Sequence, residues 1–152
     1  MGFAYPKFEF SAPPELGAKA VARHPVAIIG AGPVGLSLAI DLATRGQKCV
    51  VLDDDDTVSI GSRGLCYAKR TLEIWDRLGC ALPMVDKGVT WQIGKVFFGE
   101  RQVYAFDLLP EGGHRFPAFI NLQQYHLENF LVARAQALAN IEQRFKSKLA
   151  AI

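Results

Sequence analysis

One stretch decides the fold: VAIIGAGPVGLSLAIDLATRGQKCVVLDDDD, residues 26–56. It begins with a short apolar run at residues 26–29 and has a second run at residues 49–52. Continuous apolar runs of this length are typical of strands buried on both faces of a parallel sheet. The segment between the runs is long enough for a helix. The stretch therefore predicts a β-α-β unit with parallel strands and a helical crossover.

The connecting segment, residues 34–45, is a predicted amphipathic helix. Pro33 suits the first helical position, because its missing N–H leaves no intrahelical hydrogen bond unmade there. Leu38, Leu42 and Ala39 between them recur at helical spacing. Gly46 follows directly and suits a helix C-terminal cap.

The hexapeptide GAGPVG, residues 30–35, joins the first strand to this helix. A G-x-G-x-x-G pattern is weak alone, but in a complete β-α-β unit it indicates dinucleotide binding. Gly30 permits the tight turn, Gly32 lets the backbone approach a diphosphate, and Gly35 lets the helix pack on the strand. The helix N-terminus offers N–H groups to the phosphates. The residues expected at the dinucleotide are Gly30, Gly32, Pro33, Val34 and Gly35.

Asp53 ends the second strand about twenty residues after Gly30, where a carboxylate accepts hydrogen bonds from a ribose. Asp54 is the other candidate for that contact. The acidic run 53–56 would repel a 2′-phosphate, so NADP is not expected in this site. From the residues alone we predict a dinucleotide-binding α/β domain, and NAD and FAD both stay open.

The chain before the motif differs from the rest. Residues 1–25 are rich in proline, alanine and aromatic side chains and show no periodicity, which predicts an irregular N-terminal arm ahead of a domain at 26–152. We expect its aromatics, Phe3, Tyr5, Phe8 and Phe10, to pack on the body of the protein. Beyond the β-α-β unit we predict helices at 71–78 and 124–138, a hairpin from strands 96–98 and 103–106, and strands at 119–122, 141–145 and 149–152.

Composition narrows the class further. The chain has 152 residues and a net charge of +2, with scattered cations, which argues against nucleic-acid binding. No apolar stretch is long enough for a membrane span, and the N-terminus lacks the layout of a signal peptide. Cys49, Cys66 and Cys80 have no framework or metal-site spacing, so we expect reduced, buried thiols in a cytoplasmic protein and no metal site.

Two further stretches carry a resemblance to a known family. They are GSRGLCYAKRTLEIWDRLG, residues 61–79, and FINLQQYHLENFLVARA, residues 119–135. Together with residues 26–56 they resemble the FAD-dependent aromatic hydroxylases, the single-component flavoprotein monooxygenases, and most closely the branch similar to 3-(3-hydroxyphenyl)propionate hydroxylase. The resemblance implies FAD as the cofactor. It also implies a Rossmann-like FAD-binding domain with a parallel sheet and a small antiparallel hairpin.

The resemblance also implies roles for two later residues. In the family an arginine after the second strand contacts the FAD pyrophosphate, and Arg63 matches it; a planar guanidinium suits a diphosphate. A glutamine that begins a Q-x-x-L-E helix also contacts the cofactor, and Gln124 matches it, whereas Glu128 reads as structural. The family has glutamate at the ribose position, so either Asp53 or Asp54 can make that contact here.

For a complete enzyme the resemblance implies NADH or NADPH as electron donor and hydroxylation of a small aromatic substrate. The family's later cofactor motifs and its substrate-binding residues would lie beyond Ile152, so we expect a domain that is incomplete relative to the family. We assign no catalytic side chain. We expect the isolated chain to bind FAD weakly or not at all, and a missing C-terminal part or a partner chain would complete the enzyme.

Other classes remain as alternatives. A truncated or split nucleotide-binding remnant would have no activity alone. A flavoprotein disulfide reductase would need a cysteine pair, whereas Cys66 stands alone near residues 60–70. An NAD-dependent dehydrogenase leaves the stretches around Arg63 and Gln124 unexplained.

Overall fold

The computed structural model describes residues 2–19, 21–61 and 63–151. The chain divides into two compact units. Unit 1 comprises Met1–Arg63 and Gln124–Ile152, and unit 2 comprises Gly64–Gln123. Each unit is described by itself.

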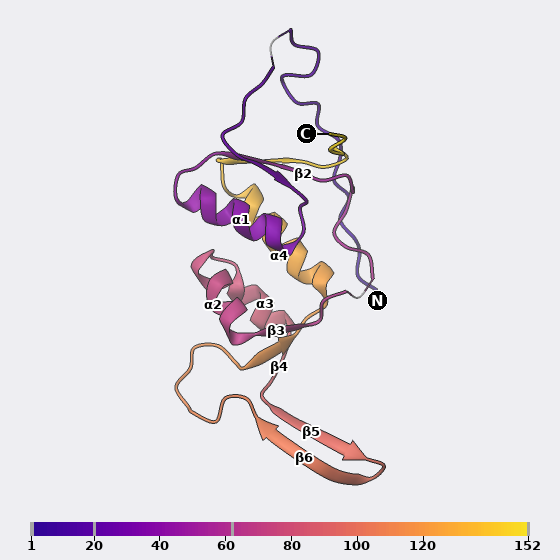
Figure 1. The fold of residues 1–152 in the computed structure, drawn as a ribbon, viewed down its shortest axis with the longest axis vertical. Coiled ribbons are helices and arrows are strands. Elements are labelled where there is room, and N and C mark those ends of the chain that lie inside the picture. The colour runs from indigo at the N-terminus through magenta and orange to yellow at the C-terminus, as the bar shows by residue number, and fades with distance from the viewer. Residues whose placement is uncertain (1, 20, 62, 152) are drawn as a thin grey trace. The chain divides into compact units, whose positions relative to one another are not determined.

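Unit 1 is built on a three-stranded parallel sheet. Strands β1 (Ala27–Ile29), β2 (Cys49–Leu52) and β8 (Ile141–Arg144) lie in the order β1-β2-β8. Helix α1 (Pro33–Thr44) connects β1 to β2 and packs on β2 and on helix α4 (Gln124–Gln136), as Figure 1 shows. The predicted β-α-β unit and the predicted later helix are thus confirmed.

The buried face of α1 differs from the predicted one. Leu38 is 48% exposed and Leu42 is half-buried. The helix turns a different stripe toward the core, one that starts two residues earlier and includes Ala39. In α4, Leu127 and Leu131 are buried. The buried residues of α1 are Leu36, Ala39, Ile40 and Ala43.

The ends of α1 follow the sequence signals. The helix begins at Pro33, and Gly32 is its N-cap residue in an extended conformation. Gly46, just after the helix, has φ +82°. L-residues with side chains seldom adopt this left-handed conformation, so the predicted glycine C-cap is confirmed.

The chain after β8 does not form the predicted strand at 149–152. The described residues 149–151 have no strand structure, and Ile152 lies outside the described residues. Lys146 adopts φ 54° and turns the chain across the carboxyl end of the sheet. There the Ser147 N–H donates to the Asp53 carbonyl at 2.7 Å. An apolar run without a neighbouring strand has nothing to pair with, and so it remains irregular.

Unit 2 contains a small antiparallel sheet and two short helices. Strands β3 (Cys66–Ala68), β7 (Phe119–Asn121) and β4 (Val89–Trp91) lie in the order β3-β7-β4. Helices α2 (Lys69–Arg77) and α3 (Ala81–Lys87) pack against each other. The sequence predicted α2 and β7 but not β3, α3 or β4. The buried residues of this unit include Leu72, Trp75, Leu78, Met84, Ile120 and Leu122.

Unit 2 also contains the predicted hairpin. Strands β5 (Ile93–Phe98) and β6 (Arg101–Asp107) pair antiparallel, with an irregularity between Val96 and Phe97 (Figure 1). Its apolar side chains are largely exposed, and Phe98 is 79% exposed. A two-stranded hairpin of this kind is marginally stable by itself.

The N-terminal arm has neither helix nor strand among its described residues 2–19 and 21–25. Three of its aromatics pack on unit 1: Phe3 against Tyr125, Tyr5 against Tyr125, and Phe8 against Phe145. The fourth, Phe10, is 49% exposed. The arm is therefore a docked segment of unit 1.

The cysteines only partly match the prediction. All three are free thiols, and Cys49 and Cys80 are buried. Cys66 is exposed, because the first strand of the small sheet places it at the surface. Within the described part of the chain, no helix is long and apolar enough to cross a membrane.

Candidate functional site

A pocket of about 200 Å³ opens at the carboxyl ends of β1 and β2. Open parallel sheets bind their ligands outside the carboxyl ends of the strands, so its position is that of a cofactor site. The structure brings three predicted site residues together here. The lining residues are Ile29, Gly30, Leu52, Asp53, Asp54, Ser147, Lys148 and Leu149.

The glycine loop has the backbone that the motif predicts. Gly30 has φ +100°, and its N–H donates to the Leu52 carbonyl at 2.7 Å. A Cβ added to Gly35 would lie 2.0 Å from the Gly30 carbonyl oxygen, so only glycine allows this approach of helix to strand. A Cβ added to Gly32 would meet no atom within 4 Å. The space beside Gly32 is open, as a diphosphate approaching the backbone requires.

Some backbone N–H groups of this loop donate to protein acceptors, and others have no intrahelical acceptor and are left for a ligand. The N–H groups of Gly30 and Ala31 already donate to protein acceptors. Pro33, the first helical residue, has no N–H. The N–H groups of Val34 and Gly35 belong to the first turn of α1, whose N–H groups have no intrahelical acceptor. Their partial positive charge suits an anion, so the residues present fit a dinucleotide diphosphate.

Asp53 ties the end of β2 to the glycine loop. Its Oδ2 accepts from the Ala31 N–H at 2.5 Å, and its Oδ1 accepts from the Asp55 N–H at 2.9 Å. Asp54 is exposed and also lines the pocket. Asp53 therefore shapes the loop and faces the pocket, while Asp54 presents a solvated carboxylate beside it.

The rest of the acidic run, Asp55 and Asp56, does not line the pocket. Asp55 is exposed, and Asp56 pairs with Lys7 of the arm at 2.8 Å. The hydrogen bond from Lys7 is the main cause of a lowered pKa of Asp56. The four aspartates thus serve different purposes, although they are adjacent in sequence.

Arg63 and Gln124 do not line this pocket. Arg63 is exposed in the loop after β2, and its neighbour Ser62 lies outside the described residues. Gln124 begins α4, and its Nε2 donates to Glu128 Oε1 at 2.7 Å. Their predicted contacts with a cofactor remain predictions.

Glu128 has a clear structural role. Its side chain is 4% exposed, and its Oε2 accepts from the Ser59 N–H at 2.6 Å. Its other oxygen accepts from Gln124. Because both carboxylate oxygens are hydrogen-bonded, the buried group ties the loop after β2 to the first turns of α4.

Ser147, Lys148 and Leu149 also line the pocket, and the sequence analysis did not predict them as site residues. Leu149 was assigned to the predicted strand 149–152, and Ser147 and Lys148 lie between that strand and the predicted strand 141–145. A signal was available, because loops at the carboxyl ends of all strands of a parallel sheet tend to line the ligand site. The loop after the third parallel strand was therefore a candidate.

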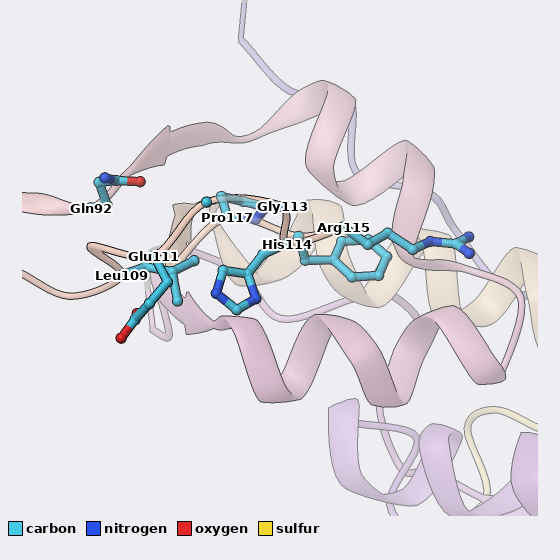
Figure 2. A pocket seen from close by; sticks show the side chains of 9 residues that line it. Gln92, Leu109, Glu111, Gly113, His114, Arg115 and Pro117 are labelled. Carbon is cyan, nitrogen blue, oxygen red and sulfur yellow. The ribbon is translucent and has the colours of Figure 1, made fainter.

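Unit 2 has a pocket of about 210 Å³ of its own, formed mainly by the loop 109–117. Figure 2 shows Arg115 extending away from Glu111 and His114. Arg115 donates to Asp76 at 2.8 Å. Within the described residues, no group of three or more His, Cys, Asp and Glu side chains is placed to hold a metal ion. The first pocket remains the candidate site.

Comparison with known proteins agrees with this geometry. Residues 23–152 match the model of a protein family described as FAD binding domain. The chain therefore belongs to this family of FAD-binding domains, and FAD is the family's cofactor. The match includes the glycine loop, Arg63 and Gln124 but not the first 22 residues of the arm.

Individual relatives carry related names. A flavin-dependent monooxygenase of Mycobacteroides abscessus is 34% identical over 117 residues, which cover 72% of this chain and 25% of the relative. A probable NADH-specific resorcinol 4-hydroxylase of Rhodococcus jostii is 31% identical over 137 residues, covering 89% of this chain and 25% of the relative. The chain thus spans about a quarter of the length of these relatives.

A solved structure shows the same fold. The crystal structure of p-nitrophenol 4-monooxygenase from Pseudomonas putida matches with a TM-score of 0.73 at 28% identity. The match covers 81% of this chain and 32% of that one. The predicted fold class, a Rossmann-like FAD-binding α/β domain with a parallel sheet, is confirmed.

Proposed function

We propose that this chain is the FAD-anchoring part of an FAD-dependent monooxygenase that hydroxylates a small aromatic substrate with NADH or NADPH as electron donor. The observation that carries the proposal is the glycine loop, where open space beside Gly32 meets the first turn of α1. The names of the relatives, which include a resorcinol hydroxylase, support the aromatic substrate and the nicotinamide donor. The substrate-binding part would come from further polypeptide, in the same chain or in a partner.

We assign the following roles to residues of this chain. The N–H groups of Gly32, Val34 and Gly35 bind the diphosphate of the cofactor, and Pro33 fixes the start of the helix for them. Asp54 accepts hydrogen bonds from the ribose, beside Asp53, which holds the loop.

Two residues outside the pocket complete the set. Arg63 supplies a guanidinium for the diphosphate, and Gln124 supplies an amide at the start of α4. Glu128 orients that amide through its 2.7 Å hydrogen bond.

FAD, when bound, would accept a hydride and reduce dioxygen. The residues of this chain bind and orient it, and the described residues of the pocket include no group that we assign to proton transfer. Binding and orientation are therefore the activity that we ascribe to the chain itself.

The test is titration of the chain with FAD and, separately, with NAD, followed by flavin or protein fluorescence. We expect weak FAD binding that Gly32→Ala reduces by at least about tenfold, because the new methyl group occupies the space meant for the diphosphate. Gly112→Ala, at another glycine with open space around it, is the control and should leave binding unchanged.

Two outcomes would contradict the proposal. A chain that binds NAD in preference to FAD would be a nicotinamide-dependent enzyme fragment. A folded chain that binds neither would be a remnant without a cofactor.

A further inference from the structure

The first 22 residues of the N-terminal arm lie outside the matched family region, which begins at residue 23. The arm is nevertheless held to unit 1 by specific contacts of residues 3–9. We call residues 3–9 the strap. The contacts of the strap fall on the segments that surround the cofactor pocket.

The strap contacts the loop after β2, residues 53–61, at two points. At one point, Lys7 Nζ lies 2.8 Å from Asp56 Oδ1, and the Phe8 N–H donates to the Asp56 carbonyl at 2.7 Å. At the other, the Gly61 N–H donates to the hydroxyl oxygen of Tyr5 at 3.2 Å. The strap thus holds the loop at Asp56, within it, and at Gly61, its last residue.

The strap also packs on the two other segments near the site. The Phe3 ring lies 4.5 Å from the Tyr125 ring, and the Phe8 ring stacks on Phe145 at 4.0 Å with an angle of 18°. Aromatic pairs at such distances stabilise a fold by more than the burial of their surface area alone. Glu9 adds an ion pair with Lys146 at 3.3 Å.

Each contacted residue is a near neighbour of a residue assigned to the cofactor. Asp56 follows Asp53 and Asp54, Gly61 precedes Arg63, and Tyr125 follows Gln124. Phe145 precedes the pocket residues Ser147 and Lys148. The strap therefore contacts the loop after β2, the segment after β8 and the start of α4, each close in sequence to a residue assigned to the cofactor.

Charge explains why the loop needs such support. Four consecutive carboxylates repel one another in a loop that is otherwise largely exposed. Lys7 and Lys146 place cations beside Asp56, and together they lower its pKa. The two cations thus offset the charge of Asp56, which does not line the pocket.

We propose that Tyr5 and Lys7 are positioning residues for the cofactor site: they hold loop 53–61 in the conformation that presents Asp53, Asp54 and Arg63. The inference rests on the proposed function for the identity of the cofactor, but not for the state of the loop. Cofactor affinity thus depends on a segment that the family match does not include.

The experiment measures amide hydrogen exchange of the full chain without ligand, for Tyr5→Phe and Lys7→Met. Tyr5→Phe keeps the ring contacts and removes one acceptor. We expect exchange within residues 53–61 to accelerate about fivefold in each variant, the effect of one lost hydrogen bond. Exchange in α1 and in unit 2 should be unchanged. Lys19→Met, an exposed arm residue, is the control, and Lys7→Arg should restore the wild-type rate.

The same variants are then titrated with FAD. The double variant Tyr5→Phe/Lys7→Met should bind FAD about tenfold more weakly at an unchanged midpoint of thermal unfolding. Unchanged exchange in 53–61, or equal FAD affinity of the double variant and Lys19→Met, would overturn the inference. If the wild-type chain binds no FAD, the proposed function fails, and the exchange rates alone decide whether the strap holds the loop.

Discussion

The parallel sheet of unit 1 and the β5–β6 hairpin of unit 2 have similarly apolar sequences and opposite environments. In β2, Cys49, Val50 and Val51 are buried beneath α1, whereas in β5 Phe97 and Phe98 are exposed. An apolar run therefore predicts a strand in both places but does not reveal what covers it. Burial depends on layers that come from distant parts of the chain.

The largest test of this contrast is truncation of a side chain in each region. Leu131→Ala removes a fully buried side chain of α4 and should lower the free energy of unfolding by about 2–5 kcal/mol. Phe98→Ala removes an exposed side chain and should change it by less than about 0.5 kcal/mol. Chemical denaturation measures both. Equal losses would show that the hairpin is covered in solution.

A second test adds a methyl group to one glycine in each region. The steric overlap is similar at both sites, but the atom that is overlapped belongs to the backbone in one and to a side chain in the other. A Cβ at Gly35 would lie 2.0 Å from the backbone oxygen of Gly30, and a Cβ at Gly94 would lie 2.1 Å from the ring of Phe106. Gly35→Ala should lower the free energy of unfolding by about 1–3 kcal/mol, because the backbone of Gly30 cannot move away from the new methyl group. Gly94→Ala should change the free energy of unfolding by less than about 0.5 kcal/mol, because the half-buried Phe106 ring belongs to an open hairpin and can rotate. A cost at Gly94 that matched the cost at Gly35 would mean that the hairpin is packed as rigidly as the sheet.

The smallest expected effect concerns charge. Arg144 donates to Glu15 of the arm at 2.5 Å, and this hydrogen bond lowers the pKa of Glu15 to about 2 from its ordinary 4.5. A lowered folded-state pKa means that the stabilisation is complete above pH about 4.5 and is lost as the pH falls to about 2.

Glu15→Gln should therefore be less stable than wild type. The difference in the free energy of unfolding should be constant above pH about 4.5 and should approach zero near pH 2. Urea midpoints across this range measure the difference. Glu100→Gln, at the exposed turn of the hairpin, should show none at any pH. A pH-independent difference for Glu15→Gln would show that the carboxylate charge does not stabilise the docked arm.

Local patterns were sufficient for much of the fold and of the site. The β-α-β unit, α4 and the hairpin were predictable because each carries both a period and an end signal, such as Gly46 after α1. Gly30, Asp53 and Asp54 were predictable as one site because motif and strand end fall together. The strands β3 and β4 have three residues each, too few for a period to show, although β7, which is equally short, was predicted.

The remaining errors have tertiary causes. Residues 149–151 have the apolar composition of a strand, but the left-handed turn at Lys146 takes the chain to the pocket instead. Leu38 is exposed because the sheet meets the neighbouring stripe of α1. The contacts of Tyr5 and Lys7 join residues about fifty positions apart, and no local pattern encodes such a pairing.

The acidic loop after β2 also has a consequence for the order of folding. Its Asp55 and Asp56 carbonyls accept from the N–H groups of Lys146 and Phe8, so the loop is held between the two ends of unit 1. Such pairings must close long stretches of chain before they stabilise anything. During synthesis the arm, β1, α1 and β2 leave the ribosome long before residue 146. The cofactor pocket is therefore among the last parts of unit 1 to mature.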